Sequence, residues 1–390
     1  MAAFEGVDYY ALDGLLSDEQ KLVRDTVREF VSDKILPVID EHQREGTFPV
    51  EALPGMAAMG LLGANLEGYG LPGLDNISYG LILQELERGD SGLRSFVSVQ
   101  GALCMYPIWR YGSEAQKEQW LPAMGRGDVI ACFGLTEPDA GSDPGAMRTR
   151  AEFDGDEWVL NGVKYWITNG TIAQLAIVWA KTDKGIRGFL VPTDTPGFSA
   201  NKVTGKYSLR VSDTAELVLQ DCRISADNVL PDAEGLKGPL TCLNQARYGI
   251  SWGAVGAAMA CYDEALRYAK NRIAFGRPVA ATQLMQELLV DCVTEITKAQ
   301  LMCLRLGQLK EAGTVTPQQV SMAKRNNVLM ALNTARTCRE ILGGNGILDD
   351  YQSFRHMVNL ESVYTYEGTH QIHTLIVGHD ITGYPAFGEH

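Results

Sequence analysis

Apolar residues in the first third of the chain recur every three to four positions, which is the spacing along one face of an α-helix. The segments Ser17-Asp18-Glu19-Gln20 and Ser113-Glu114-Ala115-Gln116 have the form of helix-capping boxes. A helix is also predicted over about 77–87, and Asp90-Ser91 is expected to cap another that continues to about residue 111. Residues 1–130 are therefore expected to form a helical domain.

The hydrophobic period falls to two in the next part of the chain, which predicts strands over residues 131–238. Residues 158–160 and 163–167 flank Asn161-Gly162, and this dipeptide between alternating apolar positions predicts a β-hairpin turn. Further strands are expected over 175–180, 188–191 and 215–219. The pattern indicates a small antiparallel β domain, either a barrel or a sandwich.

Helical spacing returns from about residue 239 to the end of the chain at 390. One long amphipathic helix is marked by Leu284, Leu288, Cys292, Ile296, Ala299, Leu306 and Leu309. Thr316-Pro317 begins the next with an N-cap and a proline at the first helical position, and Gly343-Gly344-Asn345-Gly346 is expected to end it with positive φ angles. Long helices with short loops predict an antiparallel bundle, so the fold class is mainly α with a β middle domain.

Composition narrows the class of protein. The chain has 34 Lys and Arg against 48 Asp and Glu, a net charge of -14, which argues against non-specific nucleic-acid binding. Its eight cysteines lack the close spacing of a zinc or redox motif and suit a reducing compartment. No apolar run predicts membrane insertion, and the first ten residues resemble no targeting signal. We expect a bacterial cytoplasmic protein, or a mitochondrial matrix protein whose transit peptide has been removed.

The stretch Thr365-Tyr366-Glu367-Gly368-Thr369-His370 places a single carboxylate just before an apolar helix. Tyr366 and the neighbouring apolar residues would exclude water from Glu367. A desolvated carboxylate holds its proton more tightly and becomes a usable base near neutral pH. The alternative is that Glu367 is only an acid favoured by the positive end of the following helix.

Arg94 stands in the first turn after the predicted cap at Ser91, where a cation faces the wrong end of the helix dipole. This placement costs about 0.3–1 kcal/mol, so a functional Arg94 is expected to meet an anion. The alternative is a solvated arginine that folds back on Asp90 or Glu87.

Three other segments carry possible chemistry. Residues 133–143 form a loop rich in small residues and hydroxyls, which suits a phosphate or a planar ring but serves equally as an interdomain connection. Trp166-Ile167-Thr168 ends a predicted strand, where a tryptophan is most simply core. Arg272 suits either a helix C-terminus or a pyrophosphate clamp. His370 and His373 lie one helical turn apart but lack a third ligand, so no metal site is predicted.

Together these segments resemble the acyl-CoA dehydrogenase family over nearly the whole chain. The resemblance rests on residues 133–143, 166–168, 272–278 with Gln283, 342–346 and the Glu367 stretch, all in the family's order. Within the family the chain is most similar to the glutaryl-CoA dehydrogenases, at residues 87–95, 244–250 and 366–370. Leu93 departs from that pattern, since an aromatic residue is expected beside the arginine, and this loosens the substrate assignment alone.

The resemblance implies an N-terminal helical domain (1–130), a middle β domain (131–238), a C-terminal four-helix bundle (239–390) and a homotetramer that binds FAD. In the β domain the implied FAD-binding residues are Phe133, Leu135, Thr136, Gly141, Ser142, Trp166, Ile167 and Thr168. In the bundle, where part of the site serves a neighbouring subunit, they are Arg272, Phe275, Gln283, Glu340, Leu342, Gly343, Gly344, Thr369 and Phe387. The implied acyl-CoA contacts are Glu87, Arg94, Ser95, Ser142, Leu240, Asn244, Arg247, Tyr366 and Gly368.

By the same resemblance, Glu367 removes the α-proton of an acyl-CoA thioester while the flavin accepts the β-hydrogen as hydride. Arg94 would hold the distal carboxylate of glutaryl-CoA, which then leaves as CO2 to give crotonyl-CoA, with electrons passing to an electron-transfer flavoprotein. The alternatives are a short-chain acyl-CoA dehydrogenase without decarboxylation, an inactive tetrameric binding protein of the same fold, and a flavin oxidase.

Overall fold

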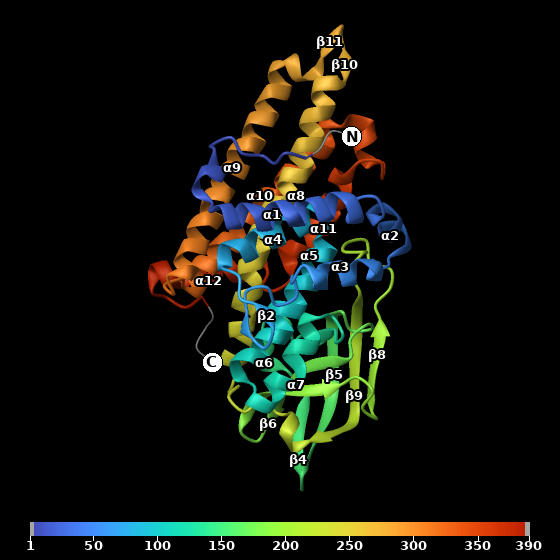
Figure 1. The fold of residues 1–390 in the computed structure, drawn as a ribbon, viewed down its shortest axis with the longest axis vertical. Helices are drawn as coiled ribbons and strands as arrows, with labels where there is room; N and C mark the ends of the chain where they lie inside the picture. Colours follow the sequence, from blue (N-terminus) through green and yellow to red (C-terminus); the bar gives the residue numbers. More distant parts are fainter. Residues whose placement is uncertain (1–3, 387–390) are drawn as a thin grey trace.

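The computed structural model describes residues 4–386, so the predicted site residue Phe387 lies outside the described part of the chain. Helices occupy the upper part of the molecule in Figure 1, and the strands of the middle segment extend below them. The predicted order of helices, β module and helices is confirmed.

The helices of the N-terminal segment follow the local signals closely. They are α1 (Asp18–Phe30), α2 (Ile39–Glu45), α3 (Leu53–Ala58), α4 (Asn76–Gly89), α5 (Ser91–Ser98), α6 (Tyr106–Tyr111) and α7 (Glu114–Gly125), with short strands β1 (Glu67–Gly68) and β2 (Leu71–Pro72). Both capping boxes, at Ser17 and Ser113, are confirmed. Asp90 rather than Ser91 caps α5, because its side chain accepts from Gly92 N at 2.7 Å.

The single helix predicted from Asp90-Ser91 to about residue 111 is wrong in one respect. A wider π-helical stretch, Val99–Met105, separates α5 from α6. Pro107 follows within the first turn of α6 and has no N–H to donate, so the ordinary α-helical bonds cannot continue across this point.

In the described part of the chain, seven strands form the middle sheet in the order β3-β6-β4-β5-β9-β8, with β7 paired to β6. Their bounds are β3 (Ala131–Gly134), β4 (Arg150–Asp154), β5 (Glu157–Thr168), β6 (Leu175–Thr182), β7 (Gly185–Pro192), β8 (Phe198–Lys202) and β9 (Thr214–Ser225). The prediction of a purely antiparallel domain is wrong, because β6 runs parallel to β3 and to the first residue of β4.

The hairpin predicted at Asn161-Gly162 is also wrong. β5 continues through both residues, and the turn between β4 and β5 lies at Gly155, whose φ is +75°. Asn161 instead accepts from Asp221 N at 2.8 Å, and a Cβ on Gly162 would lie 2.4 Å from Thr149 Oγ1. The glycine is therefore explained by a close approach of neighbouring backbone within a strand, at an irregularity in the β5–β9 register.

The C-terminal segment consists of long helices. They are α8 (Lys237–Asn271), α9 (Gln283–Glu311), α10 (Pro317–Ile341), α11 (Gln352–Thr365) and α12 (His370–Thr382), with a small hairpin of β10 (Ile273–Ala274) and β11 (Arg277–Pro278) between α8 and α9. The start predicted at Thr316-Pro317 is confirmed by a full capping box. The stretch after α10 is a 3-10 turn in which only Gly343 has a positive φ, so the prediction for the other residues there is wrong.

Helix α8 packs directly on α4, and the two share one apolar core that joins the N-terminal and C-terminal helices. Glycines on α8 make this possible: a Cβ on Gly256 would lie 1.9 Å from the Gln84 carbonyl oxygen, and one on Gly249 would lie 2.2 Å from Leu83 Cδ1. This close contact brings the C-terminal end of α4 and the start of α5 against the middle of α8.

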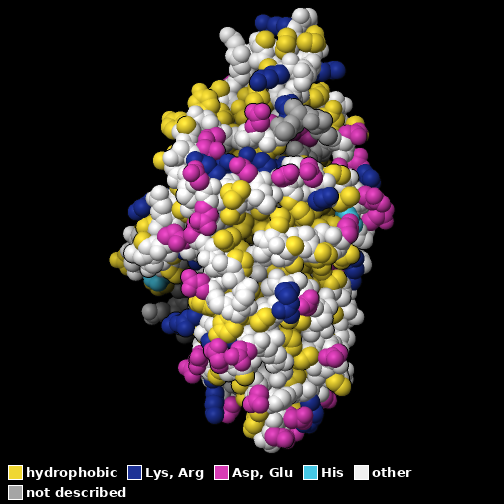
Figure 2. Space-filling view, in the orientation of Figure 1, with side chains coloured by type: hydrophobic (Ala, Val, Ile, Leu, Met, Phe, Trp, Pro, Cys, Tyr) yellow, Lys and Arg dark blue, Asp and Glu magenta, His cyan; other side chains and the backbone are white. Residues whose placement is uncertain are grey.

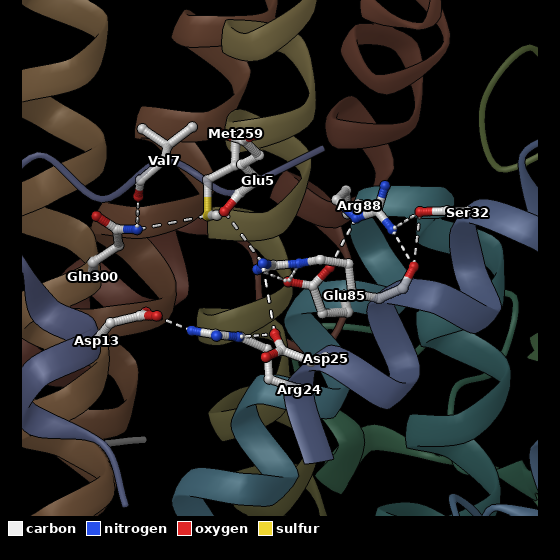
Figure 3. A network of polar contacts seen from close by, with 11 residues as sticks. Glu5, Val7, Asp13, Arg24, Asp25, Ser32, Glu85, Arg88, Met259 and Gln300 are labelled. Atoms are coloured by element: carbon white, nitrogen blue, oxygen red, sulfur yellow. Dashed lines mark hydrogen bonds and ion pairs between the residues drawn. The ribbon is translucent and has the colours of Figure 1, made fainter. Parts of the chain in front are cut away.

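A buried ion network joins the residues that precede α1 to α1 and α4 (Figure 3). Glu85 on α4 accepts from Arg28 at 2.8 Å and from Arg88 at 2.8 Å, so both of its oxygens are bound. The guanidinium groups of both arginines also lie over the ring of Phe4. On the viewed surface, acidic and basic side chains are interspersed (Figure 2).

Candidate active site

Glu367 lies in the turn between α11 and α12 with a left-handed backbone, φ +52°. Thr369 supplies the N-cap of α12, so Glu367 lies just before that helix, as the sequence predicted. Its Oε2 is buried and has no hydrogen-bond partner among the described residues. Burial raises the pKa of this carboxyl, and the charges of Arg94, Lys324 and Arg247 oppose that rise.

Two cations hold the backbone of this turn. Lys324 on α10 donates to the backbone carbonyl oxygens of Tyr366, at 3.0 Å, and Gly368, at 2.8 Å. Arg247 on α8 donates to the backbone carbonyl oxygen of Glu367, the candidate base, at 2.7 Å. A left-handed non-glycine residue costs about 1–3 kcal/mol, and these contacts hold it in place.

Arg94 is fully buried, so the alternative of a solvated arginine is wrong, although its expected contact with Glu87 exists. Nε donates to Glu87 Oε2 at 2.7 Å and Nη2 donates to the Tyr366 hydroxyl. Nη1 is buried without a hydrogen-bond partner among the described residues. Ser95 Oγ lies 3.3 Å from the same hydroxyl, so Tyr366 links this group of side chains to the Glu367 turn.

The Glu87 carboxylate fits against α8 only because residue 253 is glycine. A Cβ on Gly253 would lie 2.0 Å from Glu87 Oε2 and 3.2 Å from Arg94 Cγ. Ser91 Oγ binds the other carboxylate oxygen of Glu87 at 2.8 Å. Sequence reasoning missed Gly253, and the available signal was the repeated spacing of glycines at 249, 253 and 256 in α8.

The buried charges around Glu367 do not balance. Arg94, Arg247 and, below about pH 7, the protonated Lys324, whose pKa burial lowers to about 7, face two carboxylates, Glu87 and Glu367. Because buried ions are stable only when paired, a surplus cation with a free donor favours an anionic ligand. The site therefore suits a substrate that carries a negative group at one end.

The other predicted substrate contacts are brought together in part. Leu240, Asn244 and Arg247 lie on successive turns of α8, and Arg247 Nη1 donates to Asn244 Oδ1 at 3.3 Å. Gly368 packs on His373, since a Cβ there would lie 2.8 Å from His373 Nε2. Ser142 is exposed on the loop after β3.

The β-domain residues predicted to bind a flavin gather around the end of β5. Tyr165 N donates to the Thr136 oxygen at 2.9 Å, which places the loop after β3 beside Trp166. Trp166 has a left-handed backbone (φ +63°) and is 59% exposed, so its assignment to the core is wrong. Phe133, Leu135 and Ile167 are buried, Thr136 and Thr168 are half-buried, and Gly141 is exposed.

A buried ion pair that sequence reasoning missed holds this loop. Lys164 Nζ donates to Glu137 Oε1 at 2.9 Å and to the Leu135 oxygen at 3.0 Å. Burial disfavours the Glu137 carboxylate, but the bonds from Arg148 N and Lys164 outweigh it and lower its pKa to about 2. The pair therefore stays ionised and fixes the loop against β5, next to Trp166.

The remaining predicted flavin contacts lie elsewhere. Arg272, Leu342, Gly343 and Gly344 line a pocket of about 400 Å³. Phe275, Gln283 and Glu340 are exposed nearby on the same part of the bundle. Figure 1 shows the β10–β11 hairpin at the opposite end of the molecule from the β domain, so one chain does not bring the two sets together. Thr369 lies with Glu367.

The described residues include no group of three or more His, Cys, Asp or Glu placed to hold a metal ion. His370 stacks on Tyr364, with ring centroids 4.8 Å apart. Over the same residues, no helix has both the length and the apolar content needed to cross a membrane.

Comparison with protein families decides the assignment. Models of the N-terminal, middle and C-terminal domains of acyl-CoA dehydrogenases match residues 17–128, 132–222 and 233–382. The chain belongs to the acyl-CoA dehydrogenase family. The fold class predicted from the sequence is confirmed, and so is FAD, on which acyl-CoA dehydrogenases depend.

Several solved and curated acyl-CoA dehydrogenases are similar to this one. A glutaryl-CoA dehydrogenase from Mycobacterium smegmatis in complex with FADH2 is 50% identical, with a TM-score of 0.97 over 98% of this chain and 99% of that one. Butyryl-CoA dehydrogenase from Megasphaera elsdenii is 33% identical, with a TM-score of 0.91 over 94% and 98%. The human mitochondrial short-chain specific acyl-CoA dehydrogenase is 36% identical over 95% of this chain and 92% of its own.

Proposed function

We propose that this acyl-CoA dehydrogenase catalyses the oxidative decarboxylation of glutaryl-CoA to crotonyl-CoA and CO2. The observation that carries the proposal is the buried Arg94, whose Nη1 has no partner within residues 4–386 and whose Nη2 binds the tyrosine next to Glu367. A charge-assisted, bidentate contact to the distal carboxylate of glutaryl-CoA would occupy that donor. The 50% identity to the mycobacterial glutaryl-CoA dehydrogenase supports the same substrate.

Glu367 would act as the general base that removes the α-proton. Its buried, unpartnered oxygen has a raised pKa, which suits proton abstraction near neutral pH. The N–H of Glu367 would bind the thioester oxygen as negative charge develops there, a form of stabilisation that is often the largest contribution to catalysis. When bound, FAD accepts the β-hydrogen as hydride.

Arg94 would hold the distal carboxylate until the new double bond can accept the electrons of the breaking C–C bond. CO2 then leaves, and protonated Glu367 returns its proton to the remaining carbanion, which completes crotonyl-CoA. Glu87, Ser95 and Tyr366 would orient Arg94 for this step through the contacts described above.

The residues present fit a flavin. Trp166 offers an exposed aromatic face, and the Cβ positions of Gly343 and Gly344 open onto unfilled space beside Arg272. Because one chain does not bring these two groups together, we propose that two subunits of a homotetramer together form each FAD site. Exposed apolar side chains around the β10–β11 hairpin, among them Ile273, Phe275 and Leu284, support a subunit contact there.

The decisive experiment mixes the FAD-loaded enzyme with glutaryl-CoA without oxygen and follows flavin bleaching, CO2 and the acyl product. We expect bleaching together with crotonyl-CoA and CO2, and electron transfer to an electron-transfer flavoprotein on its addition. Glutaconyl-CoA as the accumulating product would contradict decarboxylation and leave the dehydrogenation intact.

The second candidate is a short-chain acyl-CoA dehydrogenase without decarboxylation, supported by the 36% identity to the human short-chain enzyme. The buried Arg94 argues against it, because an uncharged acyl chain would leave its Nη1 without a partner. Butyryl-CoA turned over much faster than glutaryl-CoA would favour this candidate.

A further inference from the structure

Lys324, in the third turn of α10, is almost fully buried, only 1% exposed, and differs from the buried Lys164 in its partners. It forms no ion pair with a carboxylate among the described residues, and its ammonium donates to the Tyr366 and Gly368 oxygens. Lysines are rarely buried without a partner of opposite charge. Here the two acceptors are the backbone carbonyls on either side of Glu367.

These contacts fix the orientation of the Glu367 backbone. A peptide group is planar, so a bond to the Tyr366 oxygen also orients the Glu367 N–H, which points the opposite way. The Arg247 bond to the Glu367 oxygen fixes the next plane, and the second Lys324 bond fixes the one after it. Three successive peptide planes of a left-handed turn are thus held from one side by α8 and α10.

We infer that Lys324 is a positioning residue that locks the Tyr366–Gly368 turn, so that the Glu367 carboxylate and the Glu367 N–H address the same acyl thioester. This inference rests on the proposed function, since it deepens the role given there to Glu367. Lys324 touches no reacting atom and acts through the backbone that carries the base. Misplacement of a reacting group by about 1 Å is enough to slow turnover on the order of 10²-fold.

The charge of Lys324 provides a second readout. Its proximity lowers the pKa of Glu367, together with Arg94 and Arg247. Removal of this charge should raise the pKa of the base, so the acid limb of the kcat/KM profile should move to higher pH. The charged and titratable groups that interact with these two residues include Tyr79, Glu87, Arg94, Arg247, Tyr366, His370 and His373.

Lys310 supplies a matched control. Burial lowers the pKa of Lys324 to about 7 and that of Lys310 to about 8, and Lys310 donates to Gln245 Oε1 at 2.5 Å. Lys310→Met removes a half-buried ammonium and its hydrogen bond from the bundle without touching the backbone of Glu367. Any general loss of packing or stability should therefore appear in both variants.

The experiment compares Lys324→Met, Lys324→Arg and Lys310→Met in the FAD-loaded enzyme. For Lys324→Met we expect kcat to fall on the order of 10²-fold with a KM change below about threefold, because the loss falls on the transition state. The acid limb should shift upward, and peptide amides over 365–370 should exchange hydrogen faster. Lys324→Arg should recover most of kcat, and Lys310→Met should resemble the unmodified enzyme in all three measurements.

The inference is overturned if Lys324→Met matches Lys310→Met in kcat, pH profile and hydrogen exchange. If Lys324→Met does not fold, Lys324→Gln, which keeps a donor and removes the charge, decides by the same measurements. An unmodified enzyme that oxidises no acyl-CoA would contradict the proposed function instead, and hydrogen exchange over 365–370 would still test the lock.

Discussion

Two glutamates on α4, Glu85 and Glu87, are both fully buried, both bound to arginine, and only two positions apart. Positions i and i+2 lie on different faces of a helix, so the two carboxylates enter different surroundings. Glu85 faces α1 and the residues that precede it. There, Arg28 and Arg88 bind both of its oxygens (Figure 3). Glu87 faces α8, where its partner Arg94 keeps one donor without a partner.

The difference separates an ion network that supports the fold from one that is prepared for a ligand. A buried donor left without a partner costs about 1–3 kcal/mol, and more when it is charged. The Glu85 network avoids this cost because Arg88 also donates to Ser32 Oγ and the Arg28 backbone oxygen, and Arg28 donates to the Glu5 backbone oxygen. The Glu87 network retains the cost of an unpaired donor. It lies beside the Glu367 carboxylate, whose Oε2 also has no hydrogen-bond partner among the described residues. Substitutions in the two regions should therefore have opposite signatures.

The largest effect is expected for Glu367, the proposed general base, which lies beside the Glu87 network. Glu367→Gln should lower kcat on the order of 10³-fold or more, while FAD and acyl-CoA still bind. The reason is that a glutamine amide cannot accept the α-proton, and stopped-flow measurement of flavin reduction with glutaryl-CoA checks this. Turnover near the normal rate would refute Glu367 as the base.

Arg94→Ala tests whether the free donor meets a carboxylate. We expect kcat/KM for glutaryl-CoA to fall on the order of 10²–10³-fold, which corresponds to the loss of a buried charge contact. For butyryl-CoA the loss should be much smaller, because that chain ends in a methyl group. Equal losses on both substrates would show that Arg94 supports only the shape of the site.

Glu85→Gln should produce the opposite signature. Removal of one charge from a saturated buried network leaves Arg28 and Arg88 underpaired and should lower the free energy of unfolding by about 3 kcal/mol. Turnover at a temperature well below unfolding should stay within about twofold, since Glu85 faces away from Glu367. Urea unfolding and steady-state kinetics measure the two quantities, and a large kcat loss would break the distinction between the regions.

Gly253→Ala should displace the Glu87 and Arg94 side chains without replacing a charged residue. The added Cβ would displace the Glu87 carboxylate and with it Arg94, so kcat/KM for glutaryl-CoA should fall about tenfold relative to butyryl-CoA. Gly249→Ala is the matched control, because its Cβ would clash with the Leu83 side chain and would lie at ordinary contact distance, 3.8 Å, from the Tyr79 hydroxyl. It should lower stability and leave the ratio of the two substrates unchanged.

The smallest predicted effect is on acid stability. Each region holds one fully buried histidine, His356 near Arg88 and His373 beneath Gly368, and burial lowers both pKa values to about 3. A depressed histidine pKa adds stability that is complete above about 6.5 and is lost as pH falls towards 3.

At pH 5.5 each histidine should account for about 1.4 kcal/mol of lost stability. His356→Asn and His373→Asn should each reduce the difference in unfolding free energy between pH 7.5 and 5.5 by about 1.4 kcal/mol. Only His373→Asn should also reduce turnover. An unchanged pH dependence in both variants would contradict the assignment of neutral, buried rings.

Local signals in the sequence were sufficient for most helices. The caps at Ser17, Ser113 and Thr316 were predicted correctly, because each depends on bonds among residues at most three positions apart. The order of helical and β segments follows from the hydrophobic period in the same way. Asn161-Gly162 misled because the same dipeptide serves a hairpin turn or a close approach within a strand, and β9 and Thr149, far along the chain, decide between them.

The sequence by itself determined the segment order, the helix starts and the family resemblance, all of which depend on neighbouring residues or on their order. The tertiary structure alone decided that Arg94 is buried with a free donor, that Gly253 admits Glu87, and that Lys324 lies under the Glu367 turn. These features join residues tens to hundreds of positions apart, and nothing in the residues near Lys324 marks the turn it supports. Burial and pairing are properties of the packed helices, so they exist only once α4, α8 and α10 have come together.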